Sequence, residues 1–497
     1  MHLANSLYAQ LRAARRAQLL DTGTPDTLHE GGPPPERWLQ QVWRHQRVRR
    51  TQLYLADGAP LRVLHPGFWN REAGPDFRRA VIQFGDDPPR TGDVELDLVT
   101  AGWRGHGHAT SERFANVILH VVWDEADTDR SRPPVMAIKP FLDAPLSELA
   151  EWLDLEAPAS VPDNVPGRCS GPLRELSADT LTELLRQAAQ LRRERKAVEF
   201  TARARHVGWE NALWEGLLAA LGYKHNAWAF RRLAELVPLP AIRPTAEAPS
   251  TTAHPMALEA HFLGLAGLLP LDLSRGADPH LRGLWDCWWR ERDALNEIIV
   301  PKTLWRLAGI RPANRPERRL VLAAHWRNQP TLPTRLENWI RSTSTRRPSE
   351  RALDLLQLLA PSAAETPPYW ARHWTLRSME LPEAHPLLGA PRVTDLAVNV
   401  ILPWLWARIG REGGPSELRQ AVELCWREWP AGEDNAVLRL TRQRLFGTQP
   451  MRLPARAFVQ QGLLQITRDF CDSAGALCHE CRFPDFVRAP ERLNPAG

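Results

Sequence analysis

The sequence predicts an α/β domain near the N-terminus followed by a mostly α-helical region. Two early runs, Phe77–Phe84 (FRRAVIQF) and 116–123 (NVILHVVW), are rich in β-forming residues, as strands are. From Leu181 onward, apolar residues recur at helical spacing instead, as at Leu184 and Leu185. The chain has 497 residues, a length that suggests about two to four domains.

Residues 1–35 are predicted to form a short basic helix and a linker rich in Gly, Pro and Thr. This segment lacks the apolar core and cleavage site of a secretory signal. A helix is expected over 37–47, where tryptophan and valine side chains fall on one face. Next, the dipeptide Asp57-Gly58 predicts a hairpin of two short strands over 53–64.

Three carboxylates accompany the central pair of predicted strands. Asp76 stands at the start of Phe77–Phe84, and the turn GDDPP at 85–89 leads into the next strand. In that strand Glu95 and Asp97 alternate with apolar residues. Because side chains alternate along a strand, Glu95 and Asp97 are predicted to point the same way.

Carboxylates gathered at the edge of a sheet repel one another unless a cation or protons compensate their charge. Hard oxygen ligands of this kind suit Mg²⁺ or Mn²⁺. The plainer interpretation is that Asp76 caps a turn while Glu95 and Asp97 lie on a solvated strand face. Spacing alone favours the plainer interpretation.

Histidines lie close to these carboxylates in the sequence. His106 and His108 fall in a Gly-rich stretch at 102–111 that predicts a loop, and a pair at this spacing can ligate a metal. His120 interrupts the apolar run 116–123. It is interpreted as a core residue unless it faces Glu95. The α/β domain as a whole is predicted over 36–160.

The segment 161–447 is predicted to be mostly helical, with Pro-rich links. Thr180 and Glu183 form a possible capping box at the start of its first long helix. The basic run RRERK at 192–196 is expected to be a solvated face. The tryptophans of this region are expected to pack in the core and not to stack on bases. They include Trp285, Trp288 and Trp289.

The last segment, 448–497, contains a cysteine cluster. Cys478 and Cys481 form a CxxC motif, and Cys471 lies shortly before it. Thiolates at this spacing suit Zn²⁺ or an iron–sulfur cluster, either of which normally takes four ligands. Cys169, in an irregular polar stretch, is the predicted fourth ligand. The plainer alternative is a reduced CxxC at a frayed end.

Composition places the chain among soluble globular proteins, with 43% hydrophobic and 24% charged residues. The net charge of +5 permits a nucleic-acid partner, although solubility alone explains it. No apolar stretch approaches membrane-spanning length, so no membrane association is expected. With six cysteines in 497 residues, a cytoplasmic location is expected.

Several longer motifs are distributed over most of the chain. They are LHPG at 64–67, GPDF at 74–77, GDVE at 92–95, NVILHVV at 116–122, LGYK at 221–224, RPAN at 311–314 and EDN at 433–435. Together with the terminal cysteines they resemble a bacterial family catalogued as domain of unknown function twenty-eight fifty-one. The resemblance implies no activity. The chain has Asp97 where that family tends to have His.

A looser resemblance implies chemistry. Pro75-Asp76 before one strand and Glu95-x-Asp97 in the next, in helix–strand–strand–strand–strand order, are similar to the PD-(D/E)XK nuclease core. The resemblance implies that Asp76 and Glu95 are metal ligands, but Asp97 falls where the catalytic lysine belongs. Candidates for a replacement base are Lys139, Arg79, His106 and His108. Some helicase-associated exonucleases of this fold also carry four cysteines, although there the lone cysteine precedes the nuclease motifs, whereas Cys169 follows them.

The function expected from these features is metal-dependent phosphodiester hydrolysis. The sequence has no Gly-rich phosphate loop of the GxxxxGK[ST] type, no GxSxG elbow and no HExxH motif, which leaves kinase, ATPase and serine-hydrolase functions unsupported. Two competitors remain open. One is a catalytically silent nucleic-acid-binding or scaffold protein, and the other is a metal hydrolase that uses His106 and His108 on a small molecule.

Overall fold

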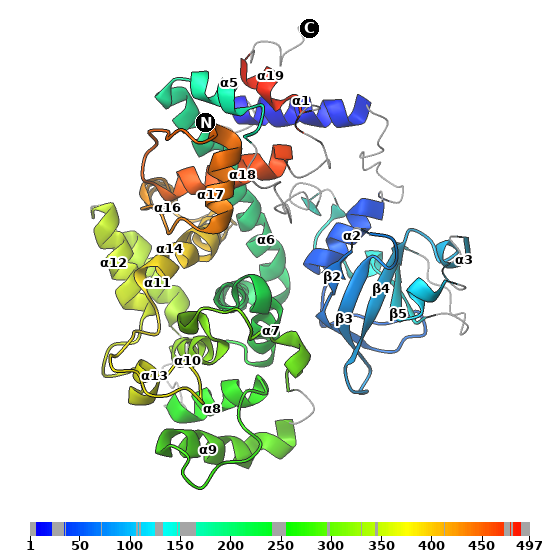
Figure 1. Ribbon diagram of the computed structural model, residues 1–497, viewed down its shortest axis with the longest axis vertical. Coiled ribbons are helices and arrows are strands. Elements are labelled where there is room, and N and C mark those ends of the chain that lie inside the picture. The colour runs from blue at the N-terminus through cyan, green and yellow to red at the C-terminus, as the bar shows by residue number, and fades with distance from the viewer. Residues whose placement is uncertain are drawn as a thin grey trace.

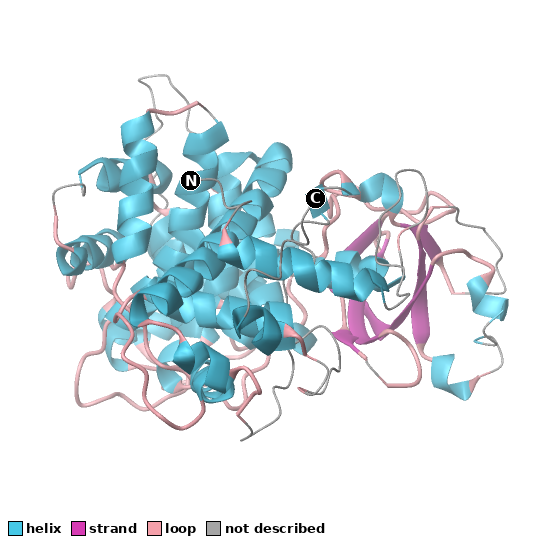
Figure 2. Cartoon of the chain, turned by 90° about the horizontal axis from the view of Figure 1, so that it is seen from above, coloured by secondary structure: helices cyan, strands magenta, loops and turns pink. Residues whose placement is uncertain are grey.

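A mixed α/β region is followed by a mostly helical region in the computed structural model (Figure 1), as the sequence predicts. Figure 2 shows that the strands gather at one end of the molecule while helices fill the rest. The structure describes residues 6–21, 34, 36–70, 72–105, 108, 111–124, 133–146, 148–149, 166–240, 255–295, 299–329, 331–342, 346–411, 413–471, 478 and 481–488.

The α/β region contains a six-stranded mixed sheet. Its strands are β1 (Leu61–His65), β2 (Phe68–Trp69), β3 (Phe77–Phe84), β4 (Arg90–Asp97), β5 (Val117–Val122) and β6 (Val135–Ala137). The order is β1-β3-β4-β5-β6, and β2 pairs with β3. The pairs β1–β3 and β3–β4 are antiparallel, whereas β4–β5 and β5–β6 are parallel. Every residue of β5 is buried, which explains its continuous apolar sequence.

Helix α2 (Glu36–His45) covers one face of this sheet. Its Leu39 and Trp43 pack in one apolar core with Val94 and Leu96 of β4. Because side chains alternate along a strand, Glu95 and Asp97 project from the other side of β4. The tryptophan-rich side of α2 therefore packs on one face of β4, and the carboxylates lie on the opposite face.

Two local predictions in this region need correction. The expected hairpin over 53–64 is reduced to one isolated bridge between Tyr54 and Pro60, followed by β1. The Leu55 N–H bonds the Ala59 oxygen and the Leu61 N–H bonds the Leu53 oxygen on either side of this bridge, so the turn at Asp57-Gly58 is present. The expected loop at 102–111 includes a one-turn helix, α3 (Gly102–Gly105), which lies in the crossover between the parallel strands β4 and β5.

The rest of the described chain is helical. Its helices are α1 (Leu7–Asp21), α5 (Ser170–Glu175), α6 (Ala178–Leu221), α7 (Tyr223–Leu236), α8 (Pro255–Leu265), α9 (Pro279–Leu295), α10 (Pro316–Arg327), α11 (Leu332–Ser342), α12 (Pro348–Leu359), α13 (Pro368–Arg372), α14 (Ala390–Leu396), α15 (Leu402–Arg411), α16 (Ser416–Glu428), α17 (Ala436–Phe446), α18 (Ala457–Cys471) and α19 (Phe483–Arg488). Short turns are η3 (Glu112–Phe114), η4 (Lys139–Phe141), η6 (Lys302–Leu304), η7 (Pro312–Asn314) and the π-helical η8 (Ala397–Ile401). Several helices, including α8, α9, α10, α12 and α13, begin at a proline, the position where its missing N–H costs nothing. None of the helices among these described residues is long and apolar enough to cross a membrane.

The 44-residue α6 is the longest element of this region. It starts one turn earlier than the predicted capping box, because Ser177 is the N-cap and its side chain accepts a hydrogen bond from the Thr180 N–H. The helix is kinked at Gly208, whose φ of 79° and ψ of 162° lie outside the helical range. Such angles suit glycine, which has no Cβ to clash.

The basic run 192–196 is not a solvated face, so that prediction is wrong. Arg193 and Arg195 are buried. The Arg193 guanidinium lies 4.0 Å from the ring centroid of Trp406 and bonds Glu423 at 2.5 Å. Carboxylates and aromatic rings far away in the sequence compensate these charges, and no local pattern announces them.

The tryptophans of α9 follow the core prediction only in part. Trp288 is buried, whereas Trp285 and Trp289 are half-buried, with ring centroids 4.7 Å apart. The Arg292 guanidinium lies 3.9 Å from the Trp289 centroid. This pair is an aromatic and cationic patch at the rim of the core.

Ion pairs join the α/β region to the helical region. Arg50 lies 3.1 Å from Glu215 of α6 and 2.7 Å from Glu235 of α7. His206 Nε2 lies 2.9 Å from the backbone oxygen of Asp143. All of these contacts come from the part of α6 on either side of its kink and from the neighbouring α7.

Helix α1 packs on the helical region. The Tyr8 hydroxyl donates to Asp469 Oδ2 at 2.6 Å, and Arg12 lies 3.3 Å from the same carboxylate. Asp469 belongs to α18, which packs along α6. The two ends of the described chain therefore meet on one side of α6 (Figure 1).

Candidate metal centre on the sheet

Asp76 is fixed at the point where β3 begins. Its Oδ2 accepts a hydrogen bond from the Leu96 N–H of β4 at 3.1 Å. Its Oδ1 accepts a hydrogen bond from the Gln40 side chain of α2 at 2.8 Å. The carboxylate thus satisfies a backbone donor at the end of the β3–β4 ladder, and both of its oxygens are oriented.

Glu95 lies beside Asp76 in the middle of β4. Its Oε2 accepts a hydrogen bond from the Asp76 N–H at 3.0 Å. Its Oε1 lies 3.5 Å from His108 Nδ1. Because Asp76 bonds the backbone of β4 and Glu95 bonds the backbone of Asp76, the two acidic groups are locked together across the two strands.

Asp97 lies two residues further along β4 and contacts β5. The register of the parallel pair sets Glu95 opposite His120, and His120 Nε2 lies 2.9 Å from Asp97 Oδ2. His120 is fully buried. It is therefore more than a core residue of β5, because it bonds one of the three carboxylates.

Gly102 of α3 gives Asp97 the space it occupies. A Cβ at position 102 would lie 2.6 Å from both Cγ and Oδ1 of Asp97. Contacts this short do not occur, so a larger residue would displace the carboxylate. By contrast, a Cβ at Gly105, the last residue of α3, would meet nothing within 4 Å.

Glu95, Asp97 and His108 form a cluster with metal-ligand spacing. One ligand atom from each lies within 4.8 Å of the other two. All three side chains are at most 10% exposed. Two carboxylate oxygens and an imidazole nitrogen are a donor set that divalent transition metals accept.

Burial and mutual repulsion perturb the two linked carboxylates. Burial, and after it the charge of Glu36, raises the pKa of Asp76 to about 7. The hydrogen bond from Leu96 lowers this pKa but does not offset the rise. Burial, followed by the charge of Asp76, raises the pKa of Glu95 to about 9. Near neutral pH Glu95 therefore holds a proton and Asp76 is partly protonated, unless a cation replaces the protons.

Aromatic rings enclose the histidines. The His108 ring stacks on Phe114, with centroids 4.0 Å apart and planes 11° apart. The Trp103 ring lies 5.5 Å from His108 and 5.3 Å from His120. Trp103 is buried, so its indole excludes water from one side of the cluster.

A β-bulge shapes the neighbouring part of β3. The register between β3 and β4 shifts between Phe77 and Ala80, and Arg79 adopts a φ of 59°. The Arg79 N–H donates to Asp93 Oδ1 at 2.9 Å. Bulges often lie next to active sites because they redirect side chains, and here Arg78 and Arg79 are both exposed.

Of the site residues expected from the sequence, the structure brings together Asp76, Glu95, Asp97 and His108. His106 lies outside the described residues. Sequence reasoning places His120 in the core unless it faces Glu95, and the strand register does set it opposite Glu95. Sequence reasoning misses Gly102. A histidine within an otherwise apolar strand is a signal for His120, and the sequence offers no signal for Gly102.

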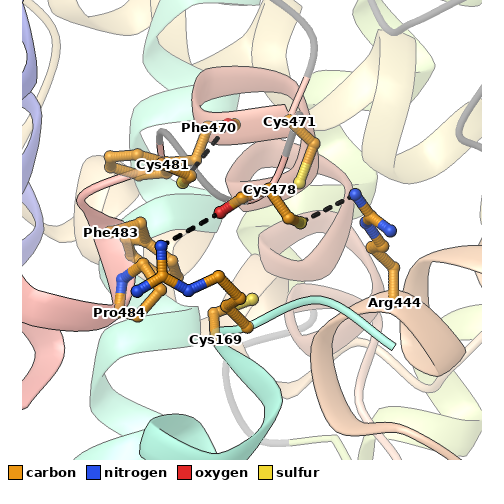
Figure 3. Close-up of a pocket in the computed structure, with 9 residues that line it drawn as sticks. Cys169, Arg444, Phe470, Cys471, Cys478, Cys481, Phe483 and Pro484 are labelled. Atoms are coloured by element: carbon orange, nitrogen blue, oxygen red, sulfur yellow. Dashed lines mark hydrogen bonds between the residues drawn. The ribbon is translucent and has the colours of Figure 1, made fainter. Parts of the chain in front are cut away.

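The predicted cysteines lie around one small cavity (Figure 3). Cys169 is the N-cap of α5, Cys471 ends α18, and Cys478 and Cys481 precede α19. Burial, followed by the neighbouring thiol of Cys481, raises the pKa of Cys471 to about 12. The lone cysteine is therefore brought to the three C-terminal cysteines.

The fold and site define a mixed α/β domain with a buried carboxylate–histidine cluster, joined to a helical region. The family model described as Protein of unknown function (DUF2851) matches residues 36–435, and the chain belongs to this family. No curated protein and no solved structure matches the chain.

Proposed function

We propose that this chain is a metal-dependent nuclease built on a PD-(D/E)XK-like core. The observation that carries the proposal is the cluster of Glu95, Asp97 and His108, whose ligand atoms lie within 4.8 Å of one another. The order of α2, antiparallel β1, β3 and β4, then α3 and the parallel β5 supports the similarity. Asp76 and Glu95 occupy the positions that the similarity assigns to acidic ligands.

The donor set fits a hard or borderline divalent cation. Mg²⁺ prefers oxygen ligands, whereas Mn²⁺ also accepts imidazole, so His108 favours Mn²⁺. Glu95, Asp97 and His108 would hold the cation, which would supply an activated water and stabilise charge on phosphate oxygens. The raised pKa of Glu95, about 9, fits the same idea, because a positive charge would replace the proton.

The surrounding residues orient the cluster. His120 bonds Asp97 at 2.9 Å, as histidine–carboxylate pairs around metal sites do. Gln40 and the Leu96 N–H hold the two oxygens of Asp76. Asp97 cannot act as the missing lysine would, since a carboxylate carries no positive charge. In this chain it serves as a ligand.

Arginines beside the site provide contacts for a phosphate backbone. Arg78 and Arg79 are exposed on β3, directly after Asp76 and Phe77. Arg44 of α2 lies 4.8 Å from the Trp69 ring centroid. Cationic side chains on these two elements would bind phosphates without reading sequence.

The test is metal-dependent cleavage of nucleic acid by the purified full chain. Supercoiled DNA, single-stranded DNA and RNA are each incubated with Mg²⁺ or Mn²⁺ and with EDTA. We expect metal-dependent cleavage that falls by about 100-fold in E95Q or D97N, as loss of metal-site groups does. E72Q, which removes an exposed carboxylate from the preceding loop, is the matched control. Cleavage that survives in E95Q would refute the assignment.

A second candidate is a metal hydrolase acting on a small molecule. The presence of His108 in the cluster and of Asp97 in place of lysine favours it. The same variants distinguish the two: hydrolysis of small esters or phosphodiesters without cleavage of DNA or RNA would indicate this alternative. Binding of nucleic acid with neither activity would indicate a catalytically silent protein.

A further inference from the structure

We propose that Cys169, Cys471, Cys478 and Cys481 hold a metal centre through four thiolates, separate from the carboxylate site. The four residues line one cavity and come from two segments that lie far apart in the sequence, one with Cys169 and the other with Cys471, Cys478 and Cys481. None of these four described cysteines is in a disulfide. Thiols that converge in this way, without forming disulfides, are the ligand set of structural zinc and of iron–sulfur clusters.

The cavity between the cysteines suits an ion. Its volume is about 10 Å³, close to that of one water-sized sphere. In a tetrahedral zinc site with Zn–S distances of about 2.3 Å, the sulfurs lie about 3.8 Å apart. No three of the four described sulfurs lie within 4.8 Å of one another. Zinc would draw the sulfurs inward, whereas an iron–sulfur cluster would require a larger space than the present cavity.

Positive charge surrounds the cysteines. Four thiolates with Zn²⁺ carry a net charge of −2, and so does a four-thiolate iron–sulfur cluster in its common oxidised form. Arg444 Nη2 donates to Cys478 Sγ at 2.8 Å, and Arg168 Nη1 donates to the Cys478 backbone oxygen at 3.5 Å (Figure 3). A guanidinium that donates to sulfur matches a thiolate better than a thiol, whose sulfur is a weak acceptor. Such outer contacts also orient metal ligands.

The backbone around Cys169 is adapted to this arrangement. The Gly167 N–H donates to the Arg444 backbone oxygen at 2.7 Å. A Cβ at Gly167 would lie 3.0 Å from that oxygen and 3.2 Å from Cys169 Sγ. Glycine thus lets the loop before α5 approach α17, and this approach sets Cys169 against the C-terminal cysteines.

Apolar rings close the other side of the cavity. Phe470 and Phe483 line it and stack on each other with centroids 4.2 Å apart. The rings and the two arginines shield part of the cavity, in which Cys169 is buried and the other three cysteines are half-buried.

The test is the metal content of the full chain purified without added metal or chelator, under anaerobic conditions. About one zinc per chain supports a zinc centre. An iron–sulfur cluster is supported if the protein contains iron with an equal amount of inorganic sulfide and shows an absorbance band at about 400 nm. Protein with neither metal, and with all four thiols reacting with a thiol reagent or Cys478 and Cys481 oxidised to a disulfide, overturns the proposal.

Variants locate the centre. We expect C169S, C471S, C478S and C481S each to lower the metal content by about 10-fold or more. C287S is the matched control, since Cys287 is half-buried in α9 and does not line the cavity. If a variant fails to fold, counting the thiols of the native wild type before and after chelation answers the question. Metal that is retained in C169S would exclude the four-ligand site. Because nuclease activity depends on other residues, the failure of either proposal leaves the other intact.

Discussion

Replacing Glu95 with glutamine is expected to stabilise the metal-free protein as the pH rises. Burial and the charge of Asp76 raise the Glu95 pKa from 4.5 to about 9. An unfolded glutamate loses its proton near 4.5, whereas the folded one retains it, so the folded state binds more protons between these values. Its contribution to stability is therefore fully present below about pH 4.5 and is lost as pH rises towards 9.

The magnitude follows from the shift in pKa. One pKa unit corresponds to about 1.4 kcal/mol, so the interval from 4.5 to pH 7 corresponds to about 3 kcal/mol. Glutamine has nearly the same shape and no charge, so E95Q escapes this loss. Asp76 keeps its raised pKa in E95Q, because burial and the charge of Glu36 raise it.

Urea unfolding in EDTA at pH 5, 7 and 8.5 measures the effect. The free energy of unfolding of E95Q minus that of the wild type should rise by about 3 kcal/mol between pH 5 and 7. E72Q, which changes the exposed Glu72, should follow the wild type. Added Mn²⁺ should stabilise the wild type at pH 8.5 and leave E95Q unchanged. A variant with the same pH dependence as the wild type would refute the account of Glu95.

Three further substitutions test other features. G102A would bring a methyl group 2.6 Å from Asp97, so the affinity for Mn²⁺, measured by calorimetry, should fall by about 10-fold or more. The control is G105A, whose methyl group would meet nothing within 4 Å, so it should bind Mn²⁺ normally. Equal affinities of the two variants would contradict the role of Gly102. G208A places a Cβ at a φ of 79° and should lower the free energy of unfolding by about 1 kcal/mol or more; an unchanged urea midpoint would show that the kink is dispensable. R50A removes one of the arginines that pair with Glu215 and Glu235, which keep Arg203 and Arg232. It should therefore cost less in urea unfolding than the about 3–5 kcal/mol of a buried charge left without a partner. R49A is the control, and an effect no larger than that of R49A would be the contrary result.

Strands and carboxylates could be predicted because their signals are local. The residues of Phe77–Phe84 alone indicate a strand, and β3 has these bounds. Alternation along β4 sets Glu95 and Asp97 on one side whatever the rest of the chain does. The gathering of Asp76, Glu95 and Asp97 was therefore within reach of the sequence.

Other features depend on contacts between segments that are far apart in the sequence. The bond between His120 and Asp97 requires the register of two parallel strands, which no local pattern specifies. Likewise, Arg193 appears solvated until Glu423, from α16, is placed beside it. Gly102 is informative only when the position of Asp97 is known.

The packing of α1 on α18 has a consequence for the order of events on the ribosome. Tyr8 bonds Asp469, which follows it by 461 residues. At about 5–20 residues per second, roughly 20–90 s pass between the synthesis of the two residues. The six strands end at Ala137, so the nascent sheet can pair long before α18 is made. The contact between α1 and α18 is therefore among the last of the native contacts that can form.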